Sequence, residues 1–313
     1  QMTRGPRGKL LSGREAVGRF VQDGSTVYFG GFGFLQAFSL AHEVIRQRKR
    51  ELTVVREAGD ILVDQLIGAG CVRRLVTSHV WNPIGPSSAY CFRRAVEERD
   101  PPVEVEEMGY GSISMALMAG AMDLPFMPTT EHAGTGQFQH RSFLGERKFQ
   151  VIESPFSGEK VTVVAPLKPE VGLIHVQRAD VEGNCQVVGP LGNLRFGANA
   201  CRTIVASAEE IVDKGLIQLS SNLTIIPGFR VSAVVHDSLG AHPSESFGYY
   251  DRDIQFAYDY SQRARTRDGF QAFLDEWVFG VNDREEYTRR LGEDRLKKLV
   301  EIYRYQHGRD WPE

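Results

Sequence analysis

The sequence contains few cysteines and no long apolar run. Its four cysteines are widely separated and form no Cys-x-x-Cys pair, which argues against a zinc knuckle, a redox motif or a disulfide-stapled domain. No segment reaches the roughly 18 consecutive apolar residues that span a membrane, and no apolar run of signal-peptide length follows the basic start of the chain. We therefore expect a cytoplasmic protein with reduced thiols that does not bind a membrane.

An excess of charge of one sign is also missing. The chain has 37 basic and 40 acidic residues, for a net charge of -3, so it lacks the broad positive field that attracts nucleic acids. The composition, 42% hydrophobic and 25% charged in 313 residues, is that of an ordinary globular protein. A chain of this length buries a core large enough to fold without disulfides.

Apolar runs of strand length alternate with helical patterns over the first third of the chain. The expected strands are 26–29, 52–55, 74–77 and 103–106, and the expected helices are 13–21, 39–48, 60–67, 89–98 and 112–122. Alternation of this kind is typical of a parallel sheet with helices on both of its faces. We therefore predict an open, mostly parallel α/β fold.

Runs of β-branched residues continue into the second half of the chain. Those at 161–164, 171–176, 203–205 and 231–235 are expected to extend the same sheet. From about residue 251 the pattern changes to charged helices with aromatic stripes, expected at 253–264, 267–279 and 284–305. No flexible linker separates the two parts. We divide the chain into an α/β domain over residues 8–250 and a C-terminal helical extension over residues 251–313 that packs on it.

The most distinctive motif is the glycine turn Gly30-Gly31-Phe32-Gly33 at the end of the first expected strand. Glycines let the backbone turn sharply, and exposed N–H groups at a strand-to-helix junction bind phosphate or a developing oxyanion. A dinucleotide fingerprint does not fit, because Gln36 stands at its third glycine position, and a P-loop Gly-Lys-Ser/Thr is absent. From these residues alone, the turn is either a ligand-binding loop or a plain tight turn.

Further motifs follow the glycine turn in a characteristic order: Leu-Pro-Phe-Met-Pro at 124–128, Ala-Asp-Val-Glu-Gly-Asn at 179–184, Ile-Pro-Gly-Phe at 226–229, Gly-Ala-His-Pro-Ser at 240–244 and Phe-Leu-Asp-Glu-Trp-Val-Phe at 273–279. Together they resemble family I coenzyme A-transferases, in the order and spacing of the α subunit of glutaconate CoA-transferase. The resemblance runs from about Arg14 to Leu299. It implies an open α/β fold of the NagB/RpiA/CoA-transferase type.

The resemblance also implies a partner and a reaction. Such α subunits assemble with a β subunit of related fold, often as α2β2, and the active site lies between the subunits. A β-subunit glutamate attacks the acyl-CoA thioester and then carries CoA as a glutamyl thioester, from which a carboxylic acid takes it. This chain is then a CoA-transferase subunit without a catalytic glutamate of its own. The CoA thioester is a substrate, and no permanently bound cofactor or metal is expected.

The positions that the resemblance assigns to substrate binding lie in two glycine loops: Gly30, Gly31, Phe32, Gly33, Phe34, Gly134, Thr135 and Gly136. The stretch after the first loop is one residue shorter than the family pattern and lacks its proline. It carries Phe34, Leu35 and Phe38 instead, which favours a larger hydrophobic acyl group.

The same fold hosts steroid ring-opening hydrolases and a decarboxylase, so a CoA-thioester hydrolase or carbon–carbon lyase subunit is an open alternative. The steroid-ring enzymes carry an acidic residue where this chain has Tyr110, and a tyrosine with a pKa of about 10 is a poor base at neutral pH. Glu107 lies close in sequence and either replaces that acid or occupies the end of the sheet. A third possibility is a non-catalytic ligand-binding or regulatory member, which would bind acyl-CoA or nothing and form a stable homo-oligomer.

Other polar residues are candidates for either a site role or a structural one. His79 follows an expected strand, at the edge where open α/β sheets bind ligands. Glu131 and His132 lie beside the second glycine loop and offer no third ligand for a metal. His242 is a family feature that we expect to order its loop. Three basic residues are candidates for contact with the CoA phosphates, and the alternative for each is an ordinary solvated side chain in a loop. They are Arg141, Arg147 and Lys148.

Overall fold

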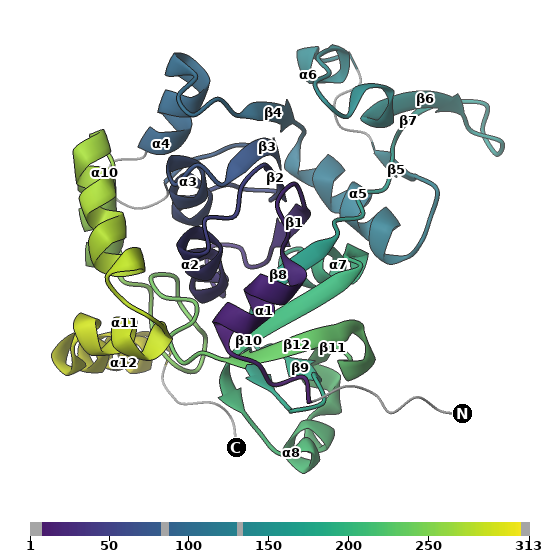
Figure 1. Ribbon diagram of the computed structural model, residues 1–313. Helices are drawn as coiled ribbons and strands as arrows, with labels where there is room; N and C mark the ends of the chain where they lie inside the picture. Colours follow the sequence, from purple (N-terminus) through teal and green to yellow (C-terminus); the bar gives the residue numbers. More distant parts are fainter. Residues whose placement is uncertain (1–7, 83–87, 130–133, 308–313) are drawn as a thin grey trace.

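The protein is described by a computed structural model that covers residues 8–82, 88–129 and 134–307. Seven parallel strands form the main part of a nine-stranded sheet among these residues (Figure 1). In spatial order they are β4 (Glu104–Glu107), β3 (Val72–Thr77), β2 (Leu52–Val55), β1 (Thr26–Phe29), β8 (Val171–Ala179), β10 (Thr203–Ile211) and β12 (Val231–His236). The expectation of an open, mostly parallel sheet is confirmed. β9 (Cys185–Gln186) and β11 (Thr224–Ile226) add an antiparallel pair beside the end of β8.

Both faces of this sheet are buried by helices. Side chains alternate between the faces, so Val27 and Phe29 of β1 belong to one hydrophobic core and Tyr28 to the other. The first core is covered by α1 (Gly13–Phe20), α2 (Phe38–Arg46), α3 (Ile61–Gly68), α9 (Ile254–Arg263) and α10 (Arg267–Leu274). The second is covered by α5 (Tyr110–Ala121) and α7 (Leu194–Ala200).

A second, smaller sheet stands beside α5 and β4 (Figure 1). It pairs β5 (Met127–Thr129), β7 (Lys160–Val164) and β6 (Phe149–Glu153) in an antiparallel arrangement. The prediction that residues 161–164 extend the main sheet is therefore wrong. A short β-branched run identifies a strand but not its partner, and here the neighbouring β6 provides a local hairpin partner.

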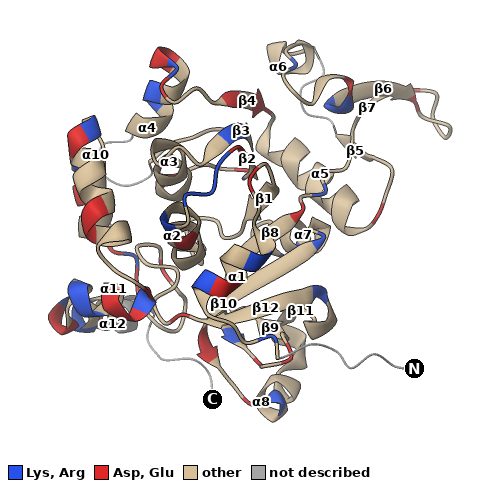
Figure 2. Ribbon diagram, in the orientation of Figure 1, with Lys and Arg blue, Asp and Glu red and all other residues tan. Residues whose placement is uncertain are grey.

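The C-terminal region is helical, as expected, but its last helix is broken. Residues 284–305 form α11 (Arg284–Leu291) and α12 (Glu293–His307), because Gly292 between them has a positive φ of 88°. Basic and acidic residues are interspersed on these helices (Figure 2). α4 (Tyr90–Arg93) and α10 each run into a π-helical turn, over Arg94–Glu98 and Asp275–Phe279. None of the helices in the described parts of the chain is long and apolar enough to cross a membrane.

Candidate active site

Four chain segments leave the carboxyl ends of neighbouring parallel strands and meet at one edge of the sheet. The glycine turn follows β1, Arg56 to Asp60 follows β2, Ser78 and His79 follow β3, and Met108 leads from β4 into α5. Ser78 is tied to the second of these segments, because its backbone N–H donates to the Glu57 carbonyl at 3.0 Å. Open α/β sheets bind ligands at this edge.

The glycine turn has a conformation that other residues do not adopt without strain. Gly31 and Gly33 have φ values of 95° and 72°. A Cβ on Gly31 would lie 2.4 Å from the carbonyl oxygen of Leu35, so the turn closes on itself too tightly for a side chain. The N–H of Phe32 donates to the Phe34 carbonyl at 3.1 Å, whereas those of Gly31 and Gly33 donate to no described residue. Two backbone donors of the turn are therefore left without an acceptor among the described residues.

Among the aromatic and aliphatic side chains of this turn, only Phe32 is substantially exposed, at 42%. Phe34, Leu35 and Phe38 are buried, and Phe34 packs edge-on against Phe247 with ring centroids 5.6 Å apart. These three side chains pack beneath the turn, and Phe38 lines a small cavity there together with Gly33 and Asp60. The expectation of a larger hydrophobic acyl group stays a prediction.

Arg56, which the sequence did not single out, holds the turn from below. It is 1% exposed, and its Nη1 donates to the carbonyl oxygens of Phe29 and Gly30 at 2.8 and 3.1 Å. Its Nη2 pairs with Asp60 at 3.2 Å, and Asp60 also caps α3 by accepting from the Leu62 N–H. The guanidinium therefore links the turn after β1 to the helix after β2.

Glu57 is a second residue that the sequence did not single out. It carries a buried carboxyl at the carboxyl edge of the sheet. It is 1% exposed. Burial raises the pKa of Glu57, while the Arg56 charge and hydrogen bonds from its own backbone N–H and from the Asn193 side chain oppose the rise. The Asn193 amide nitrogen itself donates to Ser114 Oγ at 2.7 Å. The only signal in the sequence is a charged pair directly after an apolar strand, and it does not reveal burial.

The three residues that the sequence offered as catalytic candidates differ in their surroundings. Tyr110 is half-buried at the start of α5, with its ring 5.4 Å from that of Phe32, and burial followed by the Glu57 charge raises its pKa to about 12. Glu107 is exposed at the end of β4 and accepts a hydrogen bond from Gln137. His79 is exposed, with Nδ1 2.8 Å from Ser78 Oγ. Tyr110 therefore lies beside the glycine turn, and its raised pKa leaves even less of it ionised at neutral pH, and so able to act as a base, than in a free tyrosine.

The second glycine loop is attached to β4. Gly134, Thr135 and Gly136 lead into α6 (Gly136–Gln139), whose Gln137 donates to Glu107. Glu131 and His132 fall outside the described residues. After α6, the backbone N–H groups of Ser142 and Leu144 both donate to Glu106 at 3.0 Å. The second loop is thus held near the carboxyl end of β4, on the same side of the sheet as the first.

Lys148 is not available to CoA phosphates. It is completely buried and pairs with the equally buried Glu106 at 2.9 Å, while its Nζ also donates to the His140 carbonyl at 2.7 Å. Arg141 is half-buried and pairs with Glu146, and only Arg147 of the three basic candidates is exposed. The expectation for Lys148 is therefore wrong, because the edge strand β4 and the segment after α6 enclose it.

Replacing Lys148 by methionine is expected to lower the free energy of unfolding by about 3–5 kcal/mol, because it leaves the Glu106 charge buried and unpaired. The double variant Lys148→Met, Glu106→Gln should recover part of this loss. Urea denaturation of the single and double variants measures both values. A loss below about 1 kcal/mol in the single variant would contradict the assigned ion pair.

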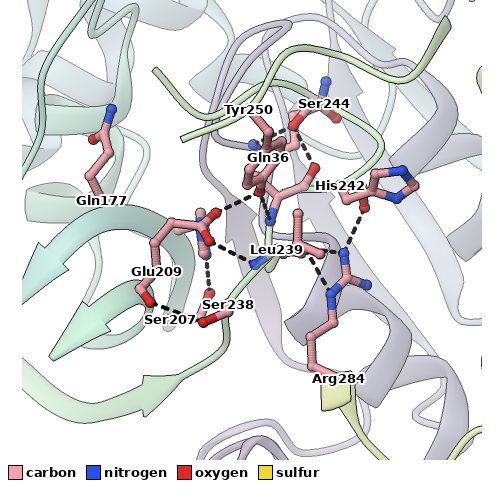
Figure 3. A network of polar contacts seen from close by, with 12 residues as sticks. Gln36, Gln177, Ser207, Glu209, Ser238, Leu239, His242, Ser244, Tyr250 and Arg284 are labelled. Carbon is pink, nitrogen blue, oxygen red and sulfur yellow. Dashed lines mark hydrogen bonds and ion pairs between the residues drawn. The ribbon is translucent and has the colours of Figure 1, made fainter. Parts of the chain in front are cut away.

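A buried polar network fixes the segment that follows the glycine turn. The Leu35 N–H donates to the Glu245 carbonyl at 2.9 Å and the Gln36 N–H to Ser244 Oγ at 3.1 Å. Figure 3 shows the surroundings of these contacts, with Glu209 accepting from the Leu239 N–H at 2.7 Å and from the Tyr250 hydroxyl. The Gly-Ala-His-Pro-Ser motif therefore supports the turn from the β10 side.

His242 lies inside this support rather than at the open edge. It is fully buried, with Nδ1 2.7 Å from the Tyr287 hydroxyl and Nε2 3.0 Å from Asp253 Oδ2. Burial lowers its pKa to about 4. Arg284 donates to the His242 carbonyl at 2.9 Å and to that of Leu239. These contacts join the motif to α9 and α11 and give His242 a structural environment.

The described residues hold no cluster of three or more metal-ligating side chains, and all four cysteines are free and buried. Burial raises the pKa of the Cys71 and Cys185 thiols to about 12. A buried thiol with a raised pKa is a poor nucleophile. Thiolate chemistry at these two positions is therefore disfavoured.

Comparisons with known proteins identify the family of the chain. Residues 11–237 match the family model described as coenzyme A transferase. The chain is 37% identical to the A-type subunit of 3-oxoadipate CoA-transferase from Pseudomonas knackmussii, over 91% of this chain and 99% of that relative. It matches the crystal structure of glutaconate coenzyme A-transferase from Acidaminococcus fermentans with a TM-score of 0.88 and 30% identity, covering 93% of this chain and 95% of that one.

A relative with a different function matches as well. The cholesterol ring-cleaving hydrolase IpdA subunit of Rhodococcus jostii is 29% identical over 88% of this chain and 94% of the relative. The family model and the two transferases nevertheless cover most of the chain and the whole site edge. The chain belongs to the coenzyme A transferase family.

Proposed function

We propose that this chain is the α subunit of a cytoplasmic, heteromeric CoA-transferase, arranged as α2β2, which moves CoA from an acyl-CoA to a carboxylic acid. The proposal is supported by relatives named as A-type subunits of such transferases, which match the chain over nearly its whole length. The observation that carries it is the glycine turn, whose two unused N–H groups lie at the carboxyl edge of the sheet.

The chemistry divides between the two subunits. A β-subunit glutamate carboxylate attacks the thioester carbon, the C–S bond breaks, and CoA leaves as a thiolate, forming an acyl-glutamyl anhydride. The thiolate then attacks the glutamyl carbonyl, releases the acyl group as a carboxylate and forms a glutamyl-CoA thioester. The acceptor carboxylate then attacks the glutamyl-CoA carbonyl and releases CoA as a thiolate, which leaves a mixed anhydride. The thiolate attacks the acceptor's carbonyl in this anhydride, which forms the new acyl-CoA and regenerates the glutamate. Gly31 and Gly33 of this chain donate hydrogen bonds to the oxyanion that develops on the acyl carbonyl.

When acyl-CoA is added to the co-purified complex of both subunits, the expected result is a covalent glutamyl-CoA adduct on the β subunit. Borohydride reduces this thioester to an alcohol, so the treated peptide is identified by mass spectrometry and the enzyme loses activity. A complex without acyl-CoA provides the control. Consumption of acyl-CoA without an adduct and without an acceptor acid would instead support the hydrolase or lyase alternative, which the IpdA relative represents.

A further inference from the structure

The small cavity beneath the glycine turn has no part in the transfer chemistry proposed above. Its volume is about 30 Å³. One water molecule needs roughly 10–15 Å³ of such space, so the cavity holds roughly two or three non-hydrogen atoms. Its wall is formed by the turn, the starts of α2 and α3, the Gly-Ala-His-Pro-Ser motif and α9. Segments from both halves of the chain therefore meet around it.

The cavity begins at the turn itself. Gly33 lines it, is partly exposed, and carries one of the two N–H groups that have no acceptor among the described residues. A Cβ on Gly33 would have no described heavy atom within 4 Å beyond its chain neighbours, so the space beside this residue is open. If the carbonyl oxygen of an acyl group binds the Gly33 N–H, the cavity lies within reach of the carbon atoms that follow the carbonyl.

Apolar side chains form part of the cavity wall. They come from α2, α3, the Gly-Ala-His-Pro-Ser motif and α9, and all are buried: Phe38, Ile61, Pro243 and Ala257. Transfer of apolar carbon atoms from water to such a surface is favourable. The wall therefore favours the alkyl end of an acyl chain.

The polar residues of the wall offer no unpaired positive charge among the described residues. Arg252 donates to both carboxylate oxygens of Glu245, at 3.0 and 3.1 Å, so its charge is neutralised. Asp60 is negative and pairs with Arg56. The other two polar residues are uncharged: Gln36 and Ser244. A carboxylate placed in the cavity would lose its hydration without gaining a cation, which is unfavourable.

We propose that this cavity binds the end of a short, uncharged acyl chain of about four carbons, and that Glu245 determines specificity by neutralising Arg252 and so disfavouring acyl groups that end in a carboxylate. The inference rests on the proposed function. It keeps the expected hydrophobic character of the acyl group but limits its length. The acids in the names of the two transferase relatives, 3-oxoadipate and glutaconate, each carry two carboxylates, so this chain would use a different class of acid.

The test measures the rate constant for glutamyl-CoA formation in single turnovers of the complex of both subunits, which need no acceptor acid. The thioesters are acetyl-CoA, butyryl-CoA and succinyl-CoA. The wild type is expected to react fastest with butyryl-CoA and at least about tenfold more slowly with each of the other two. Ala257→Val fills part of the cavity, so it should slow the reaction with butyryl-CoA about tenfold and leave that with acetyl-CoA unchanged.

A second variant tests the charge. Glu245→Gln removes the carboxylate charge at constant size and leaves Arg252 without its ion pair at the cavity. The ratio of the rate constant for succinyl-CoA to that for butyryl-CoA should therefore rise at least about tenfold. The matched control is Glu97→Gln, which removes the partner of Arg93 from an exposed pair with contacts of 3.0 and 3.2 Å, and should leave this ratio unchanged.

Ala264→Val controls for the packing effect of Ala257→Val, because Ala264 is an equally buried alanine at the end of α9 that does not line the cavity. A wild type that reacts with succinyl-CoA as fast as with butyryl-CoA would overturn the proposal, as would a ratio that Glu245→Gln leaves unchanged. If Ala257→Val does not fold, the Glu245→Gln ratio still decides. A wild type that forms no glutamyl-CoA adduct with any thioester marks the failure of the transferase function itself.

Discussion

Replacing Gly31 by alanine is expected to lower kcat for CoA transfer at least about 100-fold, because displacing reacting groups by about 1 Å has an effect of that size. Gly31 has a φ of 95°, and its new Cβ would lie 2.4 Å from the Leu35 carbonyl oxygen. The turn would have to open, which would move the Gly31 and Gly33 N–H groups that we propose bind the acyl carbonyl. Steady-state kinetics of the complex, together with its thermal unfolding, measures the effect.

Gly24→Ala is the matched control for this prediction. Gly24 has a φ of 79°, close to that of Gly31, but a Cβ there has no described atom within 4 Å. It precedes β1, at the opposite end of the strand from the glycine turn. Its alanine variant should therefore lose about 1 kcal/mol of stability from backbone strain and keep its kcat. Full activity in Gly31→Ala would remove the turn from the active site.

Replacing Arg56 by methionine is expected to reduce the free energy of unfolding by about 3–5 kcal/mol and to reduce turnover as well. The substitution leaves the buried Asp60 carboxylate without its cation and removes the donor that reaches the carbonyls of Phe29 and Gly30. Arg56→Lys should recover only part of the loss, because a lysine ammonium lacks the planar guanidinium that donates to the turn carbonyls and pairs with Asp60 at the same time. Urea denaturation and kinetics on the same samples measure both effects.

Arg73→Met controls for the loss of an arginine on the neighbouring strand. Its side chain is 48% exposed and lies 3.8 Å from Glu51, so its removal should cost no more than about 1 kcal/mol. If Arg56→Met is no more destabilising than Arg73→Met, the guanidinium does not support the turn. If stability falls but turnover per folded molecule does not, Arg56 has a purely structural role.

Much of the architecture follows from local patterns. The expected strand at 26–29 coincides with β1, and the helix expected at 13–21 coincides with α1 to within one residue. Both have a clear period and strong end signals, such as the capping box that Ser12 and Glu15 form at the start of α1. Where the pattern was right about the element but wrong about its place, as in 161–164, the missing information was the identity of the pairing strand.

The charged residues of the site show a different limit. Arg56 and Glu57 stand in sequence like any charged pair after a strand, and Lys148 like any basic residue in a loop. Charged side chains are usually exposed, so sequence reasoning treats them as solvated. All three are buried in the structure, because segments distant in the sequence close around them.

The sequence by itself determined the α/β class, the mostly parallel character of the main sheet and the resemblance to CoA-transferases, since these depend on hydrophobic period and on motifs that are local. Only the tertiary structure decided which glycine N–H groups remain free, which charged groups are buried together and which aromatic side chain faces outward. Those properties depend on contacts between residues such as Arg56 and Phe29, or Glu106 and Lys148, which are brought together by strand pairing and not by proximity along the chain.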